Sequence, residues 1–211
     1  GQFWRWVLNS LIYSGVSALV GTLVAVMAGY ATAKFNFKGK NLAIGVIMGC
    51  MLMPAALLTI PQYSIFHAMH LTNTMLSIII PCCVSPFGFF LGRVYAQTSV
   101  PNELLEAARI DGASTWRIFW KIIFPLMGPI NATIAILTAL WAWNDFLLPL
   151  ITLTDQSNQT IPLAQYVFQS QFTSNYPMAF ASYLMAMAPV LIVYIFAQKW
   201  VVGGVMRGAV K

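Results

Sequence analysis

Five apolar stretches dominate the sequence and limit what the chain can fold into. They cover approximately residues 7–33, 42–60, 74–95, 126–153 and 179–202. A bilayer core about 30 Å thick needs about 20 apolar residues per helical span, and each backbone polar group must be satisfied within that span. With 59% hydrophobic and 8% charged residues, the chain is far more apolar than a water-soluble domain. We therefore predict an all-α, polytopic membrane protein with five transmembrane helices in a single domain, residues 1–211.

The basic residues accompany alternate connections between these stretches. One group follows the first stretch, a second surrounds the long connection after the third stretch, and a third follows the fifth stretch: Lys34, Lys38 and Lys40; Arg93, Arg109, Arg117 and Lys121; and Lys199, Arg207 and Lys211. By the positive-inside rule these regions are cytoplasmic, whereas the connections 61–73 and 154–178, without Lys or Arg, are outside. The chain then begins outside, near Arg5, and its C-terminus is cytoplasmic. Topology accounts for the net charge of +6, so nucleic acid is not a predicted partner.

Small residues and prolines predict how the spans pack and where they break. Every fourth position of the first stretch is small, which predicts a face that another backbone can approach closely: Ser17, Gly21, Ala25, Gly29 and Ala33. A second close contact is expected at Gly45 and Gly49. Prolines should interrupt or end the second and third stretches, at Pro54, Pro61, Pro81 and Pro86. The broken third span is a candidate element of a transport pathway, with an ordinary kink as the alternative.

The connection at about residues 99–125 has a different composition and predicts a short amphipathic helix. Pro101 suits a first helical turn, Gly112 is a natural stop, and Ser114 can cap a second helix. The apolar face would be Leu104, Leu105 and Ala108, while Glu106 and Arg109 would project towards water or a partner.

The same segment resembles the EAA loop of bacterial ABC importer permeases. The pattern is Glu106-Ala107-Ala108, three residues, Gly112, nine residues, Ile122 and then Pro125, with Phe124 where that family favours leucine. The resemblance implies a cytoplasmic coupling helix that docks in a cleft of an ATPase subunit. It assigns this ATPase-coupling role to Glu106, Ala107, Ala108, Asp111, Gly112 and Pro125. A solvated interfacial helix is the alternative.

Four further stretches resemble the MalG-like, carbohydrate-transporting members of that family. They are Asn9-Ser10, the segment 30–40, Trp143-Asn144-Asp145-Phe146 and the final residues 208–211. The resemblance implies a type-I transmembrane domain in the bacterial cytoplasmic membrane, with a family first helix absent before Gly1. It also implies partners: a cytoplasmic ATPase dimer, a second permease subunit in a heterodimer, an extracytoplasmic solute-binding protein that faces the polar loop 154–178, and a carbohydrate. ATP and Mg would bind in the ATPase.

The sequence predicts no catalytic or metal-binding site within this chain. The sequence has no G-x-x-x-x-G-K-[ST] phosphate loop, so we expect no enzyme activity and no cofactor in this chain. His67 and His70 have a spacing compatible with a metal pair, but we interpret them as interfacial residues. Cys50, Cys82 and Cys83 fall in predicted spans and are interpreted as buried, inert thiols.

Asp145 is the acid in or near the end of an apolar stretch, which makes it a candidate functional residue. With Trp141, Trp143 and Asn144 it could line a substrate path, because aromatic faces and hydrogen-bonding groups suit a polar, ring-shaped solute. The alternative is an aromatic belt in which Asn144 and Asp145 bind neighbouring backbone. Two other functions stay open: import of another polar solute such as a glycerol-phosphate, and proton-coupled secondary transport through Asp145.

Overall fold

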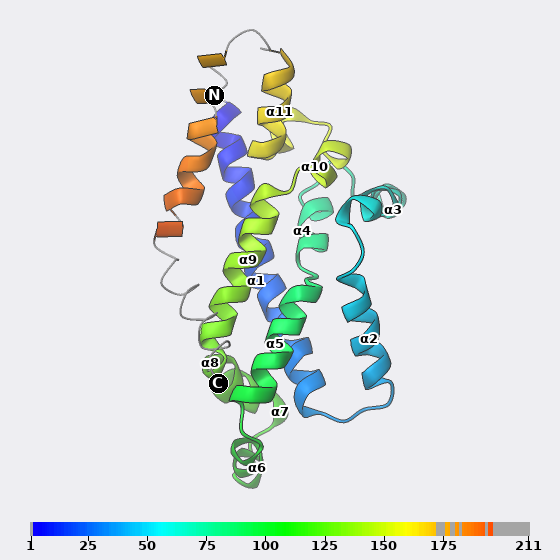
Figure 1. Ribbon diagram of the computed structural model, residues 1–211, viewed down its shortest axis with the longest axis vertical. Helices are drawn as coiled ribbons and strands as arrows, with labels where there is room; N and C mark the ends of the chain where they lie inside the picture. The colour runs from blue at the N-terminus through cyan, green and yellow to red at the C-terminus, as the bar shows by residue number, and fades with distance from the viewer. Residues whose placement is uncertain (1, 172–175, 178–179, 182, 193, 196–211) are drawn as a thin grey trace.

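The computed structural model describes residues 2–171, 176–177, 180–181, 183–192 and 194–195, and all regular structure in these ranges is helical. The helices form an elongated bundle (Figure 1). α1 (Gln2–Lys34), α5 (Pro86–Ser99) and α9 (Gly128–Asn144) run side by side in its centre. One end carries α6 (Asn102–Ile110) and the opposite end carries α11 (Ile161–Gln171). We call these the α6 end and the α11 end.

α1 is an unbroken helix of 33 residues, about 50 Å long at 1.5 Å per residue. The small residues predicted to form its packing face are buried at Ser17, Gly21, Ala25 and Gly29, where α1 meets α5 and α9. A Cβ atom on Gly21 would lie 3.2 Å from Thr138 Cγ2 of α9. The prediction of a closely packed first helix is therefore confirmed.

The second apolar stretch is not one straight span. It divides into α2 (Lys40–Cys50) and α3 (Ala55–Ala68), whose axes differ by 107°. Pro54 separates the two helices as predicted, but Pro61 lies inside α3 and does not end it. α2 alone is about 16 Å long, too short to cross a bilayer core. A Cβ atom on Gly45 or Gly49 would meet nothing within 4 Å, so the close contact expected there is not made among the described residues.

The third stretch is broken, as predicted. α4 (Leu76–Cys82) ends just before an irregular segment, and α5 begins at Pro86. The hydroxyl of Ser85 accepts the Gly88 N–H at 2.9 Å and so caps α5. Together, residues Leu76–Ser99 are long and apolar enough to cross a membrane.

The fourth stretch is preceded by a sharp turn. α7 (Thr115–Ile118), a π-helical turn η1 (Phe119–Ile123) and α8 (Phe124–Leu126) meet α9 at an angle of 79°. Pro125 cannot donate a helical hydrogen bond, and the wider π turn immediately precedes it. The stretch breaks again at Asp145–Phe146, before α10 (Leu147–Thr152) and the 3-10 turn η2 (Gln156–Asn158).

The fifth stretch is described in part, as a helix over Tyr183–Ile192. Lys199, Arg207, Lys211 and the segment 208–211 lie outside the described residues. Within the described ranges, two helices, Gln2–Lys34 and Leu76–Ser99, pass a membrane-span test of length and apolarity, and four spans result if each bent pair is counted as one. The predicted all-helical class is thus confirmed for the described residues, and the number of five spans stays a prediction, because the fifth stretch is described only in part.

Candidate functional site

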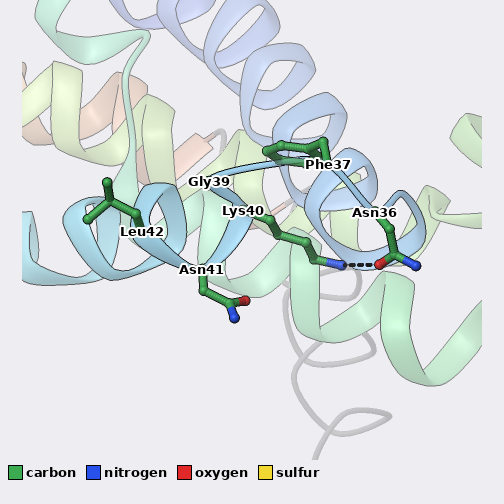
Figure 2. Close-up of a pocket in the computed structure, with 6 residues that line it drawn as sticks. All are labelled: Asn36, Phe37, Gly39, Lys40, Asn41 and Leu42. Carbon is green, nitrogen blue, oxygen red and sulfur yellow. Dashed lines mark hydrogen bonds between the residues drawn. The ribbon is translucent and has the colours of Figure 1, made fainter.

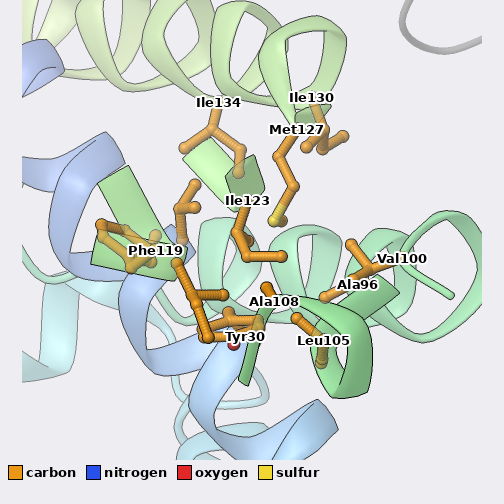
Figure 3. Close-up of a cluster of buried hydrophobic side chains, with 13 residues drawn as sticks. Tyr30, Ala96, Val100, Leu105, Ala108, Phe119, Ile123, Met127, Ile130 and Ile134 are labelled. Atoms are coloured by element: carbon orange, nitrogen blue, oxygen red, sulfur yellow. The ribbon is translucent and has the colours of Figure 1, made fainter. Parts of the chain in front are cut away.

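α6 is held against the bundle by two residues of its predicted apolar face, whereas the third, Leu104, is 37% exposed. Leu105 and Ala108 are buried in a hydrophobic cluster with Tyr30 of α1, Ile118 of α7 and Phe119 of η1 (Figure 3). The cluster also contains Ala96 of α5, Val100 directly after α5, and Ile130 and Ile134 of α9. α6 therefore packs directly against the central helices of the bundle.

The end of α6 is fixed by a Schellman motif. The N–H of Ala113 donates to the Ala108 carbonyl at 3.0 Å, and the N–H of Gly112 donates to the Arg109 carbonyl at 3.0 Å. Gly112 has a φ of 76°, and a Cβ atom there would meet nothing within 4 Å. Glycine is therefore needed at this position for its backbone conformation rather than for space. Ser114 then accepts the Arg117 N–H at 3.4 Å, which confirms the predicted cap of the second helix.

The solvent-facing side of α6 carries most of the residues predicted to couple to an ATPase. Glu106, Ala107, Asp111 and Gly112 are all exposed. Ala108 differs, because it is buried in the cluster and supports the helix from behind. Pro125 is exposed in α8, next to the π turn.

Two apolar residues of this surface were not predicted. Ile110 is 86% exposed at the end of α6, and Trp116 is 62% exposed in α7. Large apolar side chains this exposed beside charged residues are typical of an interaction surface. Helical periodicity gave a signal for Ile110, because it falls off the face formed by Leu105 and Ala108.

α6 is also bonded to the end of α1. The Lys34 ammonium donates to the Asn102 side-chain oxygen at 2.9 Å, which joins the last turn of α1 to the first turn of α6. Two residues before Lys34, the Thr32 carbonyl accepts from the Arg93 guanidinium of α5. Both cations lie at the C-terminal end of α1, where the helix dipole favours positive charge.

The structure separates the four residues predicted for a substrate path. Trp143 is buried, whereas Trp141 is 73% exposed on the same helix. The Asn144 amide donates to the Leu140 carbonyl at 2.8 Å. The Asp145 carboxylate accepts the backbone N–H groups of Leu148 and Phe146, at the start of α10. For Asn144 and Asp145 this arrangement matches the alternative interpretation, bonding to neighbouring backbone.

Trp143 and Asn144 nevertheless border a pocket of about 240 Å³ near the α11 end. Its other lining residues come from α11 and the helix Tyr183–Ile192, and they include Ile161, Gln165, Tyr183 and Met187. The pocket thus combines aromatic rings, apolar side chains and amide groups. Trp141 and Asp145 are not among its lining residues.

A second hollow, of about 350 Å³, lies at the connection between α1 and α2 (Figure 2). The Lys40 ammonium donates to the Phe35 carbonyl at 2.9 Å and to the Asn36 side-chain oxygen at 3.5 Å. This cation is therefore bonded within its own connection, and we assign the hollow no ligand.

The histidines and cysteines form no cluster in the ranges that the structure describes. No group of three or more His, Cys, Asp or Glu side chains there could hold a metal ion. His67 stacks on Tyr63, with ring centroids 5.8 Å apart. Cys83 is buried and Cys82 is partly buried, but Cys50 is exposed, contrary to the prediction of a buried thiol, because the described chain buries no residue of α2.

Comparison with known proteins identifies relatives over the whole chain. Residues 21–207 match the family described as binding-protein-dependent transport system inner membrane component. The arabinooligosaccharides transport system permease protein AraQ of Halalkalibacterium halodurans is 36% identical over 100% of this chain and 75% of its own length. The multiple sugar-binding transport system permease protein MsmG of Streptococcus mutans is 37% identical, over 100% of this chain and 76% of its own.

Two further comparisons agree with these. The melibiose/raffinose/stachyose import permease protein MelC of Bacillus subtilis is 33% identical over 97% of this chain and 75% of its own length. Among solved structures, the fold is similar to a chain of a bacterial ABC transporter involved in the import of the acidic polysaccharide alginate, with a TM-score of 0.79 and 27% identity. That similarity covers 94% of this chain and 75% of the other.

Proposed function

The chain belongs to the family of binding-protein-dependent transport system inner membrane components, and we propose that the solute it carries is a di- or oligosaccharide. It is the permease subunit of an ABC importer, a transport protein and not an enzyme. The observation that carries the sugar assignment is that relatives named for sugars, at 33–37% identity, align with 97–100% of the chain. These relatives favour a sugar over a glycerol-phosphate as the solute.

α6 is the segment through which this subunit receives the motion of a cytoplasmic ATPase dimer. Its solvent-facing side offers an acid, a small residue and an exposed apolar side chain together, at Glu106, Ala107 and Ile110. Small residues permit close approach, and charged groups give directional contacts to a partner. Asp111 and Gly112 complete the surface, and Pro125 shapes the turn behind it. ATP and Mg bind in the ATPase.

The α6 end faces the cytoplasm and the α11 end faces outward. Seven basic residues of the described chain lie in or beside the connections of the α6 end: Lys34, Lys38, Lys40, Arg93, Arg109, Arg117 and Lys121. Arg5 alone of the described basic residues lies at the α11 end. This asymmetry supports the cytoplasmic orientation of the α6 end. With this orientation, the proposed subunit has five spans and a cytoplasmic C-terminus, a solute-binding protein docks at the α11 end, and a second permease subunit lies beside this one.

The pocket between α9 and α11 is the part of this subunit that lines the sugar's path. Trp143 supplies an aromatic face, and Asn144 and Gln165 supply amide groups, the combination that a hydroxylated ring requires. Asp145 and Trp141 act outside it: Asp145 fixes the start of α10, and Trp141 faces out of the chain.

The test is transport by the whole complex in proteoliposomes. The permease is co-expressed with its partner permease and ATPase, reconstituted, and supplied with its binding protein and labelled raffinose, maltose or arabino-oligosaccharides. We expect uptake of at least one of these sugars with ATP inside the vesicles, and none with an imposed proton gradient alone. Uptake driven by the gradient without ATP would overturn the importer assignment, and ATP-driven uptake of a non-sugar solute alone would overturn the cargo.

A further inference from the structure

Side chains of the outer half of α1 donate hydrogen bonds to the loop that precedes α11, residues 156–159. Trp6, Asn9 and Tyr13 lie one or two turns apart on one face of α1. They donate to consecutive carbonyls of that loop: Trp6 Nε1 to Gln156 at 2.8 Å, Asn9 Nδ2 to Ser157 at 2.9 Å and to Gln159 at 3.0 Å, and the Tyr13 hydroxyl to Asn158 at 2.8 Å. The loop therefore follows α1 as a single unit.

Ser10 supplies the cap of α11 from a different helix. The N–H of Ile161, the first residue of α11, donates to Ser10 Oγ at 2.9 Å in a buried environment. The residue before Ile161 is Thr160, a good capping residue by type, but its own buried hydroxyl makes no hydrogen bond. Most helices are capped by a residue directly before their first turn. The cap of α11 is instead provided by α1, 151 residues earlier.

The capped turn forms a wall of the pocket described above. Ile161, Pro162 and Gln165 line it opposite Trp143 and Asn144. Ile161 and Trp143 are also buried together with Val7 of α1 in one hydrophobic cluster. The position of the wall relative to Trp143 is thus set by the contacts of α1.

The loop is held from its other side by Asn73, in the connection between α3 and α4. The Asp155 N–H donates to the Asn73 side-chain oxygen at 3.0 Å, and the Asn158 amide donates to the Asn73 carbonyl at 2.9 Å. Asn73 has a φ of 59°, a conformation that asparagine tolerates better than most residues. The loop is therefore fixed between two elements, and the bonds to α1 are the ones that connect it to the α6 end.

We propose that Ser10 and Asn9 are positioning residues for transport, which fix the α11 wall of the pocket to α1 so that the wall moves with α6. α1 is unbroken over 33 residues, and its other end is bonded to α6 through Lys34 and Asn102. A displacement received at α6 is carried along this rod to the wall. The inference rests on the proposed function, because it assigns these two residues a part in moving the solute.

The first experiment measures sugar molecules imported per ATP hydrolysed by the reconstituted complex, with labelled raffinose or whichever sugar of the panel the wild type imports fastest. This ratio does not depend on how much of a variant folds. We expect Ser10→Ala and Asn9→Ala each to lower it about fivefold while ATP hydrolysis continues, and Ser10→Thr, which keeps the hydroxyl, to restore it. The matched control is Ser14→Ala, because Ser14 is buried in the same helix but donates only within α1, to the Ser10 carbonyl at 2.7 Å and the Leu11 carbonyl at 3.3 Å.

The second measurement reads the cap itself. Hydrogen–deuterium exchange of the peptide around Ile161 should become about fivefold faster in Ser10→Ala and stay unchanged in Ser14→Ala. An unchanged transport ratio in both Ser10→Ala and Asn9→Ala, or an equal fall in Ser14→Ala, would overturn the proposal even if the wild type transports sugar. Absence of sugar uptake by the wild-type complex would instead overturn the proposed function, so the two failures are distinct.

Discussion

A Cβ atom placed on Gly29 of α1 would lie 2.6 Å from the backbone nitrogen of Arg93 in α5. It would also lie 2.7 Å from the carbonyl carbon of Gly92. The two backbones are therefore in direct contact, and no side chain fits between them. The Arg93 guanidinium donates to the Thr32 carbonyl one turn further along α1. α1 and α5 consequently form one body close to the α6 end.

Substitution Gly29→Ala is expected to destabilise the permease by about 1–3 kcal/mol, because the helices must move apart to admit the methyl group. Thermal unfolding of the purified complex measures the change. Gly15→Ala is the matched control in the same helix, since a Cβ atom there meets nothing within 4 Å. That control should be neutral or slightly stabilising, because alanine is the better helix former. Equal losses in the two variants would contradict the contact.

The features that the sequence predicted well are local ones. Gly112 and Ser114 mark the end of α6 and the start of α7 by their own backbone chemistry, and the family match confirms the resemblance of that segment. The small-residue face of α1 was also predicted correctly, because the spacing of small residues at every fourth position depends on one helix alone.

The features that the sequence did not predict depend on distant partners. The bond from Ile161 to Ser10 crosses 151 positions, and no pattern near either residue indicates it. The angle of 107° between α2 and α3 likewise depends on where each helix packs. Pro54 predicts a break between the two helices but not the direction in which the chain continues. For Asp145 the sequence left two interpretations open, a substrate path and bonding to neighbouring backbone; its carboxylate bonds backbone N–H groups at the start of α10, and a role in the path stays a prediction.

Substitution Gly112→Ala should weaken the association of the permease with its ATPase. The residue occupies a left-handed conformation with free space around it, so the cost, about 1–2 kcal/mol, is one of backbone strain alone. Gly112→Asn should have a smaller effect, because asparagine tolerates this conformation. The amount of ATPase that co-purifies with each variant measures the effect, and a stronger loss for Asn than for Ala would refute this explanation.

Ile110 is expected to be a contact for the ATPase rather than a structural residue. It is 86% exposed, so Ile110→Ala should leave the thermal stability of the isolated permease unchanged within about 0.5 kcal/mol. The same substitution should lower ATPase co-purification and sugar uptake together. Ile60→Ala is a control on α3, where the side chain is 74% exposed at the opposite end. Normal ATPase binding by Ile110→Ala would exclude the residue from the interface.

Asp155 should stay ionised over the whole range in which the transporter is assayed. The Ser157 N–H beside it, at 2.8 Å, and then Arg5 hold the pKa of its carboxyl below the usual value. A depressed folded-state pKa gives a contribution that is present above about pH 3.9, the unfolded value, and is lost as the pH falls through the folded one. The uptake rate of Asp155→Asn relative to wild type should therefore be the same at pH 5 and pH 8. If the ratio of the two uptake rates changes between pH 5 and pH 8, the hydrogen bond from Ser157 does not keep the Asp155 carboxyl ionised over this range.

Asp145 distinguishes the ATP-driven importer from a proton-coupled carrier. Its carboxylate accepts the N–H groups of Phe146 and Leu148, and Leu148 is buried, so its N–H has no water to bond if the carboxylate is lost. Asp145→Asn keeps an acceptor oxygen and should retain ATP-driven uptake within about twofold, whereas Asp145→Ala leaves the N–H of the buried Leu148 unpaired and should lose stability by about 1–3 kcal/mol. A proton-coupled role requires the ionisable group itself, so uptake would then be abolished equally in both variants, and wild-type uptake would respond to an imposed proton gradient. Parallel uptake assays of the two variants, with ATP and with the gradient, separate these outcomes.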